Sequence, residues 1–97
     1  MKKTIYELSY WLKSEVEENK NLRELLEKFG FELIYENPPK LRNLAYPINK
    51  EKIGKFGTFY FYAQSEKIEE FKNKLKGLKE VLRFIVLKRK QLKLNNK

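Results

Sequence analysis

The N-terminal segment Thr4–Leu12 alternates between two sets of side chains, as a β-strand with two different faces does. One set is entirely aromatic or aliphatic and consists of Tyr6, Leu8, Tyr10 and Leu12. The other set is mixed and consists of Ile5, Glu7, Ser9 and Trp11. We therefore expect a strand that buries its first set and leaves the second on an open face.

Two later segments carry apolar residues at helical spacing. The first covers residues 14–29, where Ser14 and Glu17 have the spacing of a capping box and Gly30 can end the helix in the left-handed conformation. Residues 17–21 lack apolar anchors, so a start near Asn19 or Asn21 is the alternative.

The second helical segment covers residues 65–80. Ser65 is its candidate N-cap, and Gly77 is the residue expected to end it. Between them, Ile68, Phe71 and Leu75 recur at intervals of three or four residues, the spacing of one helix face.

Three further strands complete the pattern. The second strand runs over Phe31–Asn37, is interrupted by Pro38 and Pro39, and resumes in residues 41–48, "LRNLAYPI". Residues 49–57 are polar and contain glycine, which predicts a hairpin loop, and the third strand follows over Thr58–Gln64. The fourth strand is Val81–Arg89. We expect one domain, residues 1–90, followed by a basic tail, residues 91–97.

The order β-α-β-β-α-β predicts an α+β, ferredoxin-like fold, in which a four-stranded antiparallel sheet carries two helices on one face. Strands one and three are then central, and strands two and four are edges. Pro47 fits this arrangement, because an edge strand tolerates a missing N–H that points away from the sheet.

The composition excludes several kinds of chemistry. The chain has 97 residues and contains no Cys, no His and no Asp. Thiolate metal sites, histidine zinc sites and histidine-based catalytic triads are therefore excluded, and we expect no enzyme activity, cofactor or small-molecule substrate. No apolar run is long enough to cross a bilayer, so we expect a cytoplasmic protein without membrane contact.

The net charge of +9 is unevenly distributed. The first helical segment has a net charge of −2 and the second of +1, so the strands, hairpin and ends carry +10. A basic excess outside the helices favours contact with a polyanion such as a nucleic acid.

The segment "LRNLAYPINKEKIGKFGTFYF", residues 41–61, resembles the bacterial small-subunit ribosomal protein six family. The resemblance extends to Tyr6-Glu7, to Phe29-Gly30 and to "VLRFIVLK" near the end, and Asn43 departs from it where the family usually has a basic residue. It implies a structural protein of the ribosome. Such a protein binds the central domain of small-subunit ribosomal RNA as a heterodimer with ribosomal protein eighteen, on the subunit platform.

The residues that we expect to contact these partners fall into two sets. The partner-protein set lies on the second strand and contains Arg42, Leu44, Tyr46 and Pro47. The RNA-binding set forms two basic poles and contains Lys2, Lys3, Lys88, Arg89 and Lys90 at one end of the sheet, with Lys50, Lys52 and Lys55 in the hairpin. Because most of these are lysines, we expect contacts with phosphates more than with base edges.

Two other functions share this fold. An RNA-recognition-motif domain stacks single-stranded RNA on aromatic residues of strands one and three, and Trp11, Tyr60 and Tyr62 lie on the expected open face. Against this, Glu7 on the same face repels phosphate. An acylphosphatase-like enzyme is less favoured still, because no glycine-rich anion loop opens the first helix.

Overall fold

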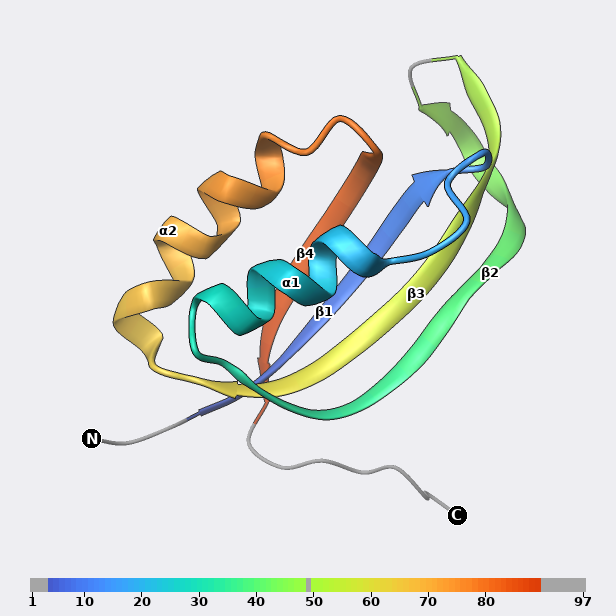
Figure 1. The fold of residues 1–97 in the computed structure, drawn as a ribbon. Helices are drawn as coiled ribbons and strands as arrows, with labels where there is room; N and C mark the ends of the chain where they lie inside the picture. Colours follow the sequence, from blue (N-terminus) through green and yellow to red (C-terminus); the bar gives the residue numbers. More distant parts are fainter. Residues whose placement is uncertain (1–3, 49, 90–97) are drawn as a thin grey trace.

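The computed structural model describes residues 4–48 and 50–89, and its elements follow the predicted β-α-β-β-α-β order (Figure 1). They are β1 (Thr4–Lys13), α1 (Lys20–Lys28), β2 (Glu32–Ile48), β3 (Glu51–Ala63), α2 (Ser65–Lys76) and β4 (Val81–Arg89). The predicted tail, residues 91–97, lies outside the described residues.

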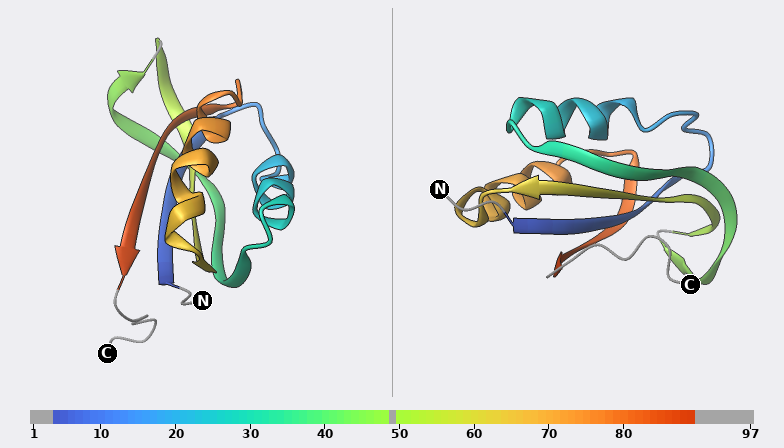
Figure 2. Two further views of the ribbon diagram at one scale, coloured as in Figure 1. Left: turned by 90° about the vertical axis from the view of Figure 1, so that its left-hand side faces the viewer. Right: turned by 90° about the horizontal axis from the view of Figure 1, so that it is seen from below.

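The sheet has the order β2-β3-β1-β4, and every neighbouring pair is antiparallel. Both helices lie on one face, and the other face is left open (Figure 2). The predicted fold class is therefore confirmed, with β1 and β3 central and β2 and β4 at the edges.

The core lies between the central strands and the helices. All four residues of the predicted buried face of β1 are in it, and Leu8, Tyr10 and Leu12 are completely buried. The other strands, the helices and their connections add Leu22, Leu26, Phe31, Phe59, Phe61, Ala63, Ile68, Phe71 and Leu75. The alternating apolar side chains of the strands and the apolar faces of the two helices thus pack together in one layer.

The start of α1 was predicted wrongly by the capping-box spacing. The helix begins at Lys20 with Asn19 as its N-cap, close to the alternative start, and Ser14 lies in the turn after β1. The backbone N–H of Val16 donates to the Lys13 carbonyl oxygen at 3.0 Å, so the chain turns before it becomes helical. At the other end Gly30 has φ +74°, as predicted.

The ends of α2 differ slightly from expectation. Its N-cap is Gln64, with no side-chain cap hydrogen bond, and Ser65 is the first helical residue. Gly77 ends the helix as predicted, but with φ −84° and therefore without the left-handed conformation.

The β2–β3 hairpin is much longer than the predicted strands. Pro38 and Pro39 do not interrupt β2; they form a bulge, because Asn37 pairs with Thr58 and Lys40 with Phe56, which leaves Gly57 opposite both prolines. The predicted loop 49–57 is also wrong, since β3 already begins at Glu51.

Gly54 was taken as a sign of a loop, but it lies within β3. A Cβ atom on Gly54 would lie 2.9 Å from the carbonyl oxygen of Leu12 in β1. Gly54 is therefore a position of close packing within the sheet, as glycine in a strand often is. The turn itself is short, and Lys50 takes a left-handed φ of +69° there.

Candidate RNA and protein interface

The outer edge of β2 leaves the sheet ladder near the hairpin tip. Asn43 pairs with Ile53 and Ile48 pairs with Glu51, so residues 44–47 lie opposite Lys52 alone. Pro47 lies in this bulged segment and has no partner residue on either side, which confirms its predicted place on an edge strand. The bulge presents side chains and unpaired backbone groups to the surroundings.

All four residues of the predicted partner-protein set lie in or next to this bulge. Arg42 lies opposite Gly54 and is exposed, as is Pro47, whereas Leu44 is half-buried. Tyr46 is 80% exposed, the highest value among the large hydrophobic side chains of the described residues. Arginine and tyrosine beside small apolar groups are typical of residues that anchor protein interfaces.

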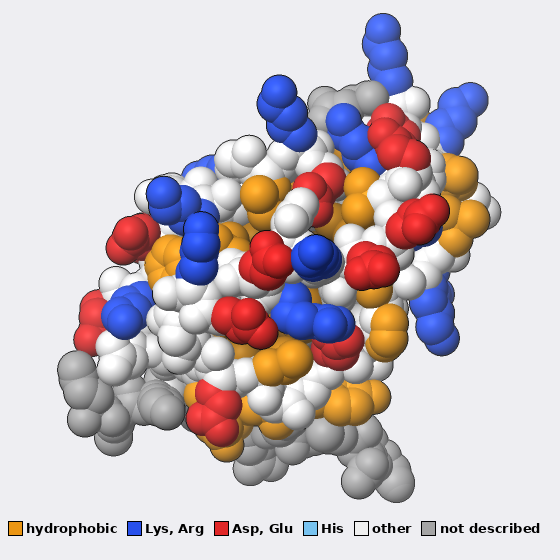
Figure 3. Space-filling view, in the orientation of Figure 1, with side chains coloured by type: hydrophobic (Ala, Val, Ile, Leu, Met, Phe, Trp, Pro, Cys, Tyr) orange, Lys and Arg blue, Asp and Glu red, His pale blue; other side chains and the backbone are white. Residues whose placement is uncertain are grey.

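The three lysines predicted in the hairpin have different surroundings. Lys50 in the turn and Lys52 in β3 are exposed, and basic side chains gather at the hairpin tip at the upper right of Figure 3. Lys55 is half-buried on the helix side, where its Nζ donates a hydrogen bond to the Val16 carbonyl oxygen at 2.7 Å. Its ammonium group therefore also holds the β1–α1 connection in place.

At the opposite end of the sheet, the start of β1 lies beside the end of β4. Lys88 pairs with Tyr6 and Arg89 with Ile5, and both basic side chains are exposed. Lys2, Lys3 and Lys90 lie outside the described residues. Arg89 forms an ion pair with Glu7, with its Nη2 atom 2.6 Å from the Glu7 carboxylate oxygen Oε1. The ion pair offsets the negative charge that Glu7 brings to the open face.

The open face carries a mixture of aromatic and aliphatic side chains. Tyr35 of β2 and Tyr60 of β3 are neighbours with ring centroids 6.2 Å apart, and Ile85 and Leu87 of β4 are about half exposed. Burial, and then the negative charge of Glu7, raises the pKa of the Tyr60 hydroxyl. Tyr60 is therefore a hydrogen-bond donor beside the Glu7 carboxylate at neutral pH.

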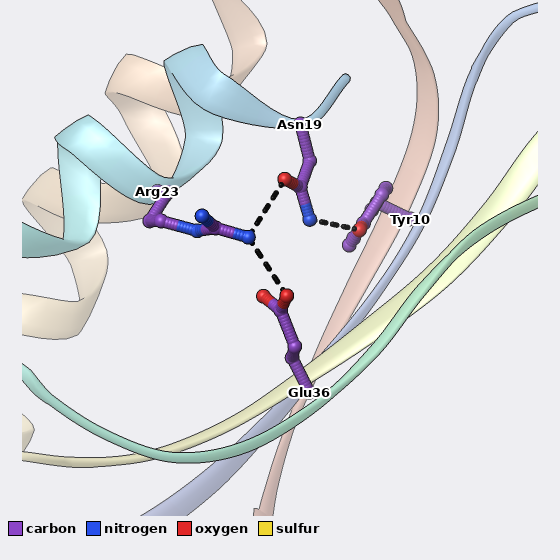
Figure 4. Close-up of polar contacts among 4 residues, drawn as sticks. All are labelled: Tyr10, Asn19, Arg23 and Glu36. Atoms are coloured by element: carbon purple, nitrogen blue, oxygen red, sulfur yellow. Dashed lines mark hydrogen bonds and ion pairs between the residues drawn. The ribbon is translucent and has the colours of Figure 1, made fainter. Parts of the chain in front are cut away.

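On the helix side, a polar chain links β1, α1 and β2 (Figure 4). The Asn19 amide nitrogen donates to the buried Tyr10 hydroxyl at 2.9 Å, and Arg23 donates to the Asn19 side-chain oxygen at 3.3 Å. Arg23 also pairs with Glu36 at 2.7 Å. Burial raises the pKa of Tyr10 to about 12.

Sequence patterns offered little indication of this polar chain. Tyr10 looked like an ordinary member of the apolar face, and Asn19 like a candidate helix start. One residue of the sequence, Gly57, is related to the polar chain, because it pairs with Tyr10 in the sheet. A Cβ atom at Gly57 would lie 2.3 Å from the Tyr10 hydroxyl oxygen, so the tyrosine requires a glycine there. This requirement becomes visible only when the register of β1 and β3 is known.

Residues 4–48 and 50–89 contain no group of three acidic, histidine or cysteine side chains that could hold a metal ion. Within the same described part, no helix is both long and apolar enough to span a membrane. What the fold does present is a bulged edge strand with exposed anchors, two basic poles and an open aromatic face. These features define a small α+β domain whose surface is suited to contacts with macromolecules.

Comparison with known proteins identifies the family. Residues 5–88 match the family model of ribosomal protein S6, and the chain belongs to this family. The resemblance seen in the "LAYPI" segment is thereby confirmed. Membership makes the chain a protein of the small ribosomal subunit, cytoplasmic and not an enzyme, as predicted.

Individual relatives agree with the family assignment. The chain is 33% identical over 96 residues to small ribosomal subunit protein bS6 of Borreliella afzelii, covering 95% of this chain and 69% of the relative. It is 32% identical over 89 residues to bS6 of Phytoplasma australiense, covering 86% and 96%. The crystal structure of 30S ribosomal protein S6 from Thermotoga maritima has the same fold, with a TM-score of 0.81 at 21% identity, over 91% of this chain and 89% of that one.

Proposed function

We propose that this chain binds the central domain of small-subunit ribosomal RNA as a heterodimer with ribosomal protein eighteen, and so supports assembly of the subunit platform. The observation that carries the proposal is the bulged segment 44–47 at the tip of an edge strand, with Tyr46 80% exposed. Tyrosine and arginine are enriched among the residues that anchor protein interfaces, so a partner protein that covers this segment explains why Tyr46 and Arg42 are both exposed on an irregular edge.

The energetics of β2 support the same role. None of its residues is fully buried, and none is among the side chains of the core or those packed against it. Leu33, Tyr35, Leu41 and Tyr46 instead account for most of the exposed large hydrophobic side chains in the described residues. A partner that covers the bulged end of β2 would bury Leu41 and Tyr46, which the chain itself leaves exposed.

We assign the partner-protein contact to Arg42, Leu44, Tyr46 and Pro47. The ribosomal RNA contact is assigned to the two basic poles. In the hairpin pole, Lys50 and Lys52 are the better placed, because the Lys55 ammonium already donates to Val16. At the other pole, Lys88 is exposed, whereas the positive charge of Arg89 is partly offset by its ion pair with Glu7. Lysines supply point charges for phosphates, so RNA shape and the partner protein would provide the specificity.

Co-purification tests the proposal directly. A tagged chain expressed in bacterial cells is expected to bring down small ribosomal subunits, and in vitro to form a one-to-one complex with ribosomal protein eighteen. The variant Tyr46→Ala is expected to keep its fold and lose most of the heterodimer, while Tyr35→Ala, on the same strand but away from the bulge, retains it. Recovery of free RNA without small subunits would reject the proposal.

A further inference from the structure

One row of side chains crosses the open face near the hairpin and has an unusual composition. Residues directly opposite one another in antiparallel strands share a face. From β2 to β4 the row reads Lys40, Phe56, Trp11 and Arg83. Two aromatic rings thus lie on the central strands, with one cation on each edge strand.

The two rings border a shallow hollow. The Trp11 and Phe56 ring centroids are 4.9 Å apart, and the rings are tilted by 52°. The hollow has a volume of about 230 Å³ and is lined by Ser9, Trp11, Phe56, Arg83, Phe84 and Ile85. It therefore combines ring surface, an aliphatic side chain, one hydroxyl and one guanidinium.

Gly54 lies next to the indole. A Cβ atom there would lie 3.4 Å from the Trp11 ring carbon Cε3, an ordinary van der Waals distance. The indole therefore packs against β3, beside Phe56. The hollow is thus part of the packing of the sheet.

The charges of the open face are separated along the strands. The row with Trp11 and the next row toward the hairpin carry four cations, Lys13, Lys40, Arg42 and Arg83. Among the described residues, the carboxylates that the register places on this face are Glu7 and Glu32, both in rows nearer the other end. Glu7 is moreover paired with Arg89. The hollow therefore lies in a positive field.

We infer that this hollow binds an unpaired RNA base, stacked on the rings of Trp11 and Phe56, with Arg83 and Lys40 contacting the flanking phosphates. The inference rests on the proposed function and adds to it a specific contact with single-stranded RNA. Trp11 and Phe56 are both partly exposed, and aromatic rings open to solvent and flanked by cations are how proteins hold unpaired nucleotides. A hydrophobic protein segment would leave Lys40 and Arg83 without anionic partners, so RNA is the occupant that the charges favour.

Trp11 is the single tryptophan of the chain, so its fluorescence reports on the hollow. The full-length chain is titrated with a single-stranded RNA octamer, with the same octamer carrying abasic sites, and with a fully paired RNA duplex. We expect the octamer to quench the fluorescence, and the abasic octamer and the duplex to bind at least fivefold more weakly. Equal binding of the intact and abasic octamers would show attraction by charge alone and overturn the inference.

Variants separate the hollow from the rest of the face. Phe56→Leu and Trp11→Leu are each expected to weaken octamer binding by about 5- to 150-fold, since stacking contributes about 1–3 kcal/mol per base. Tyr62→Leu, on the same face but away from the hollow, is the matched control and should change it less than twofold. Arg83→Gln leaves both rings intact and should weaken binding several-fold. Unchanged binding by Phe56→Leu and Arg83→Gln would reject the inference even if Trp11→Leu does not fold.

Two further outcomes distinguish this inference from the proposed function. If ribosomal protein eighteen alone changes the Trp11 fluorescence and blocks the octamer, the hollow is a protein contact and the inference fails. If Phe56→Leu enters small ribosomal subunits and binds ribosomal RNA with unchanged affinity, the inference fails while the proposed function stands. If the unmodified chain does not co-purify with small subunits, the proposed function fails, whatever the octamer does.

Discussion

The two edge strands of the sheet, β2 and β4, are built in different ways. β4 pairs with β1 along nearly its whole length with one irregularity, and its Val81, Phe84 and Val86 pack against the core. β2 is almost twice as long, has three shifts in its register, and contributes no side chain to the core. β4 completes the domain, whereas β2 is held mainly by its ladder with β3 and by the Arg23–Glu36 ion pair. An edge that adds so little to the core is available for recognition.

The largest effect on stability is expected at Gly57 of β3, which lies between the buried Tyr10 of β1 and the proline bulge of β2. The change Gly57→Ala would place a Cβ atom 2.3 Å from the Tyr10 hydroxyl oxygen and 3.0 Å from the Asn37 carbonyl oxygen. We expect the free energy of unfolding to fall by about 3 kcal/mol, because a completely buried ring must move. Urea denaturation measures this loss.

Gly77→Ala is the control for that substitution. Gly77 has an ordinary helical φ of −84°, and the nearest atom to its added Cβ is 3.5 Å away. Alanine there should leave stability unchanged or raise it by about 0.5 kcal/mol. Equal losses at both glycines would show that the fit around Tyr10 is not the cause.

Because the polar chain between β2 and α1 includes the Tyr10 hydroxyl, the free energy of unfolding should decrease as the pH rises above 10. The pKa of Tyr10 is raised from 10.0 to about 12 in the folded protein. Below pH 10 both states hold the proton; above it the unfolded chain loses the proton first, so folding weakens by about 1.4 kcal/mol per pH unit until about pH 12. Urea midpoints measured between pH 9 and about pH 12 should fall accordingly.

Tyr10→Phe tests the origin of this slope. It removes the titrating hydroxyl and should therefore remove most of the decrease in the free energy of unfolding between pH 10 and about pH 12. It should also cost about 1–3 kcal/mol at pH 7, because the Asn19 amide loses its acceptor. Tyr46→Phe, at an exposed tyrosine, is the control. A slope that Tyr10→Phe leaves intact would assign the alkaline transition to another group.

At the level of binding, the same charge change on the two edges should have different consequences. Arg42→Glu is expected to weaken the complex with ribosomal protein eighteen about tenfold or more, because Arg42 adjoins the bulge. Its effect on stability should be about 0.5 kcal/mol or less, since the side chain is exposed. Arg83→Glu on β4 should leave heterodimer affinity nearly unchanged. Isothermal titration calorimetry without RNA measures both heterodimer affinities. Equal losses of affinity for Arg42→Glu and Arg83→Glu would contradict the assignment of the interface to β2.

The smallest expected effects concern salt. Removing one lysine that binds a phosphate should flatten the slope of log affinity for ribosomal RNA against log salt by roughly 0.7–0.9. Lys50→Gln with Lys52→Gln should therefore flatten it by about 1.4–1.8. Lys88→Gln with Arg89→Gln should flatten it less, because Arg89 is paired with Glu7. Lys55→Gln, whose ammonium donates to Val16, is the control expected to change the slope least.

Sequence reasoning succeeded where local periodicity decides the structure. Alternation identified the buried face of β1, and β4 begins and ends at the predicted residues. It failed where distant contacts decide. The long hairpin depends on Gly54 lying against the Leu12 carbonyl, and the late start of α1 accompanies contacts of Asn19 with Tyr10 and of Lys55 with Val16. The Gly54–Leu12 and Lys55–Val16 pairs are far apart in the sequence, and the Asn19–Tyr10 pair spans the turn between β1 and α1. None of the three can be read from local periodicity.

The candidate surfaces show the same division. Pro47 in an alternating segment predicted an edge strand but not the bulge of residues 44–47, and the predicted fold placed Lys88 and Arg89 at the opposite end of the sheet from Lys50 and Lys52. The Trp11–Phe56 hollow was not predicted, because Phe56 was assigned to a loop. The Arg89–Glu7 ion pair was also missed, so Glu7 was taken for an unpaired obstacle to phosphate.

The pairing of the first strand with the last has a consequence for biosynthesis. Ile5 pairs with Arg89, so one whole side of the central strand β1 has no partner until residues 81–89 have been made. A nascent chain that has completed the hairpin therefore still exposes an open β-edge beside apolar side chains, which invites aggregation. Translation that stalls shortly before β4 should be more harmful to this protein than stalling earlier, and a chaperone that shields strand edges would act at that moment.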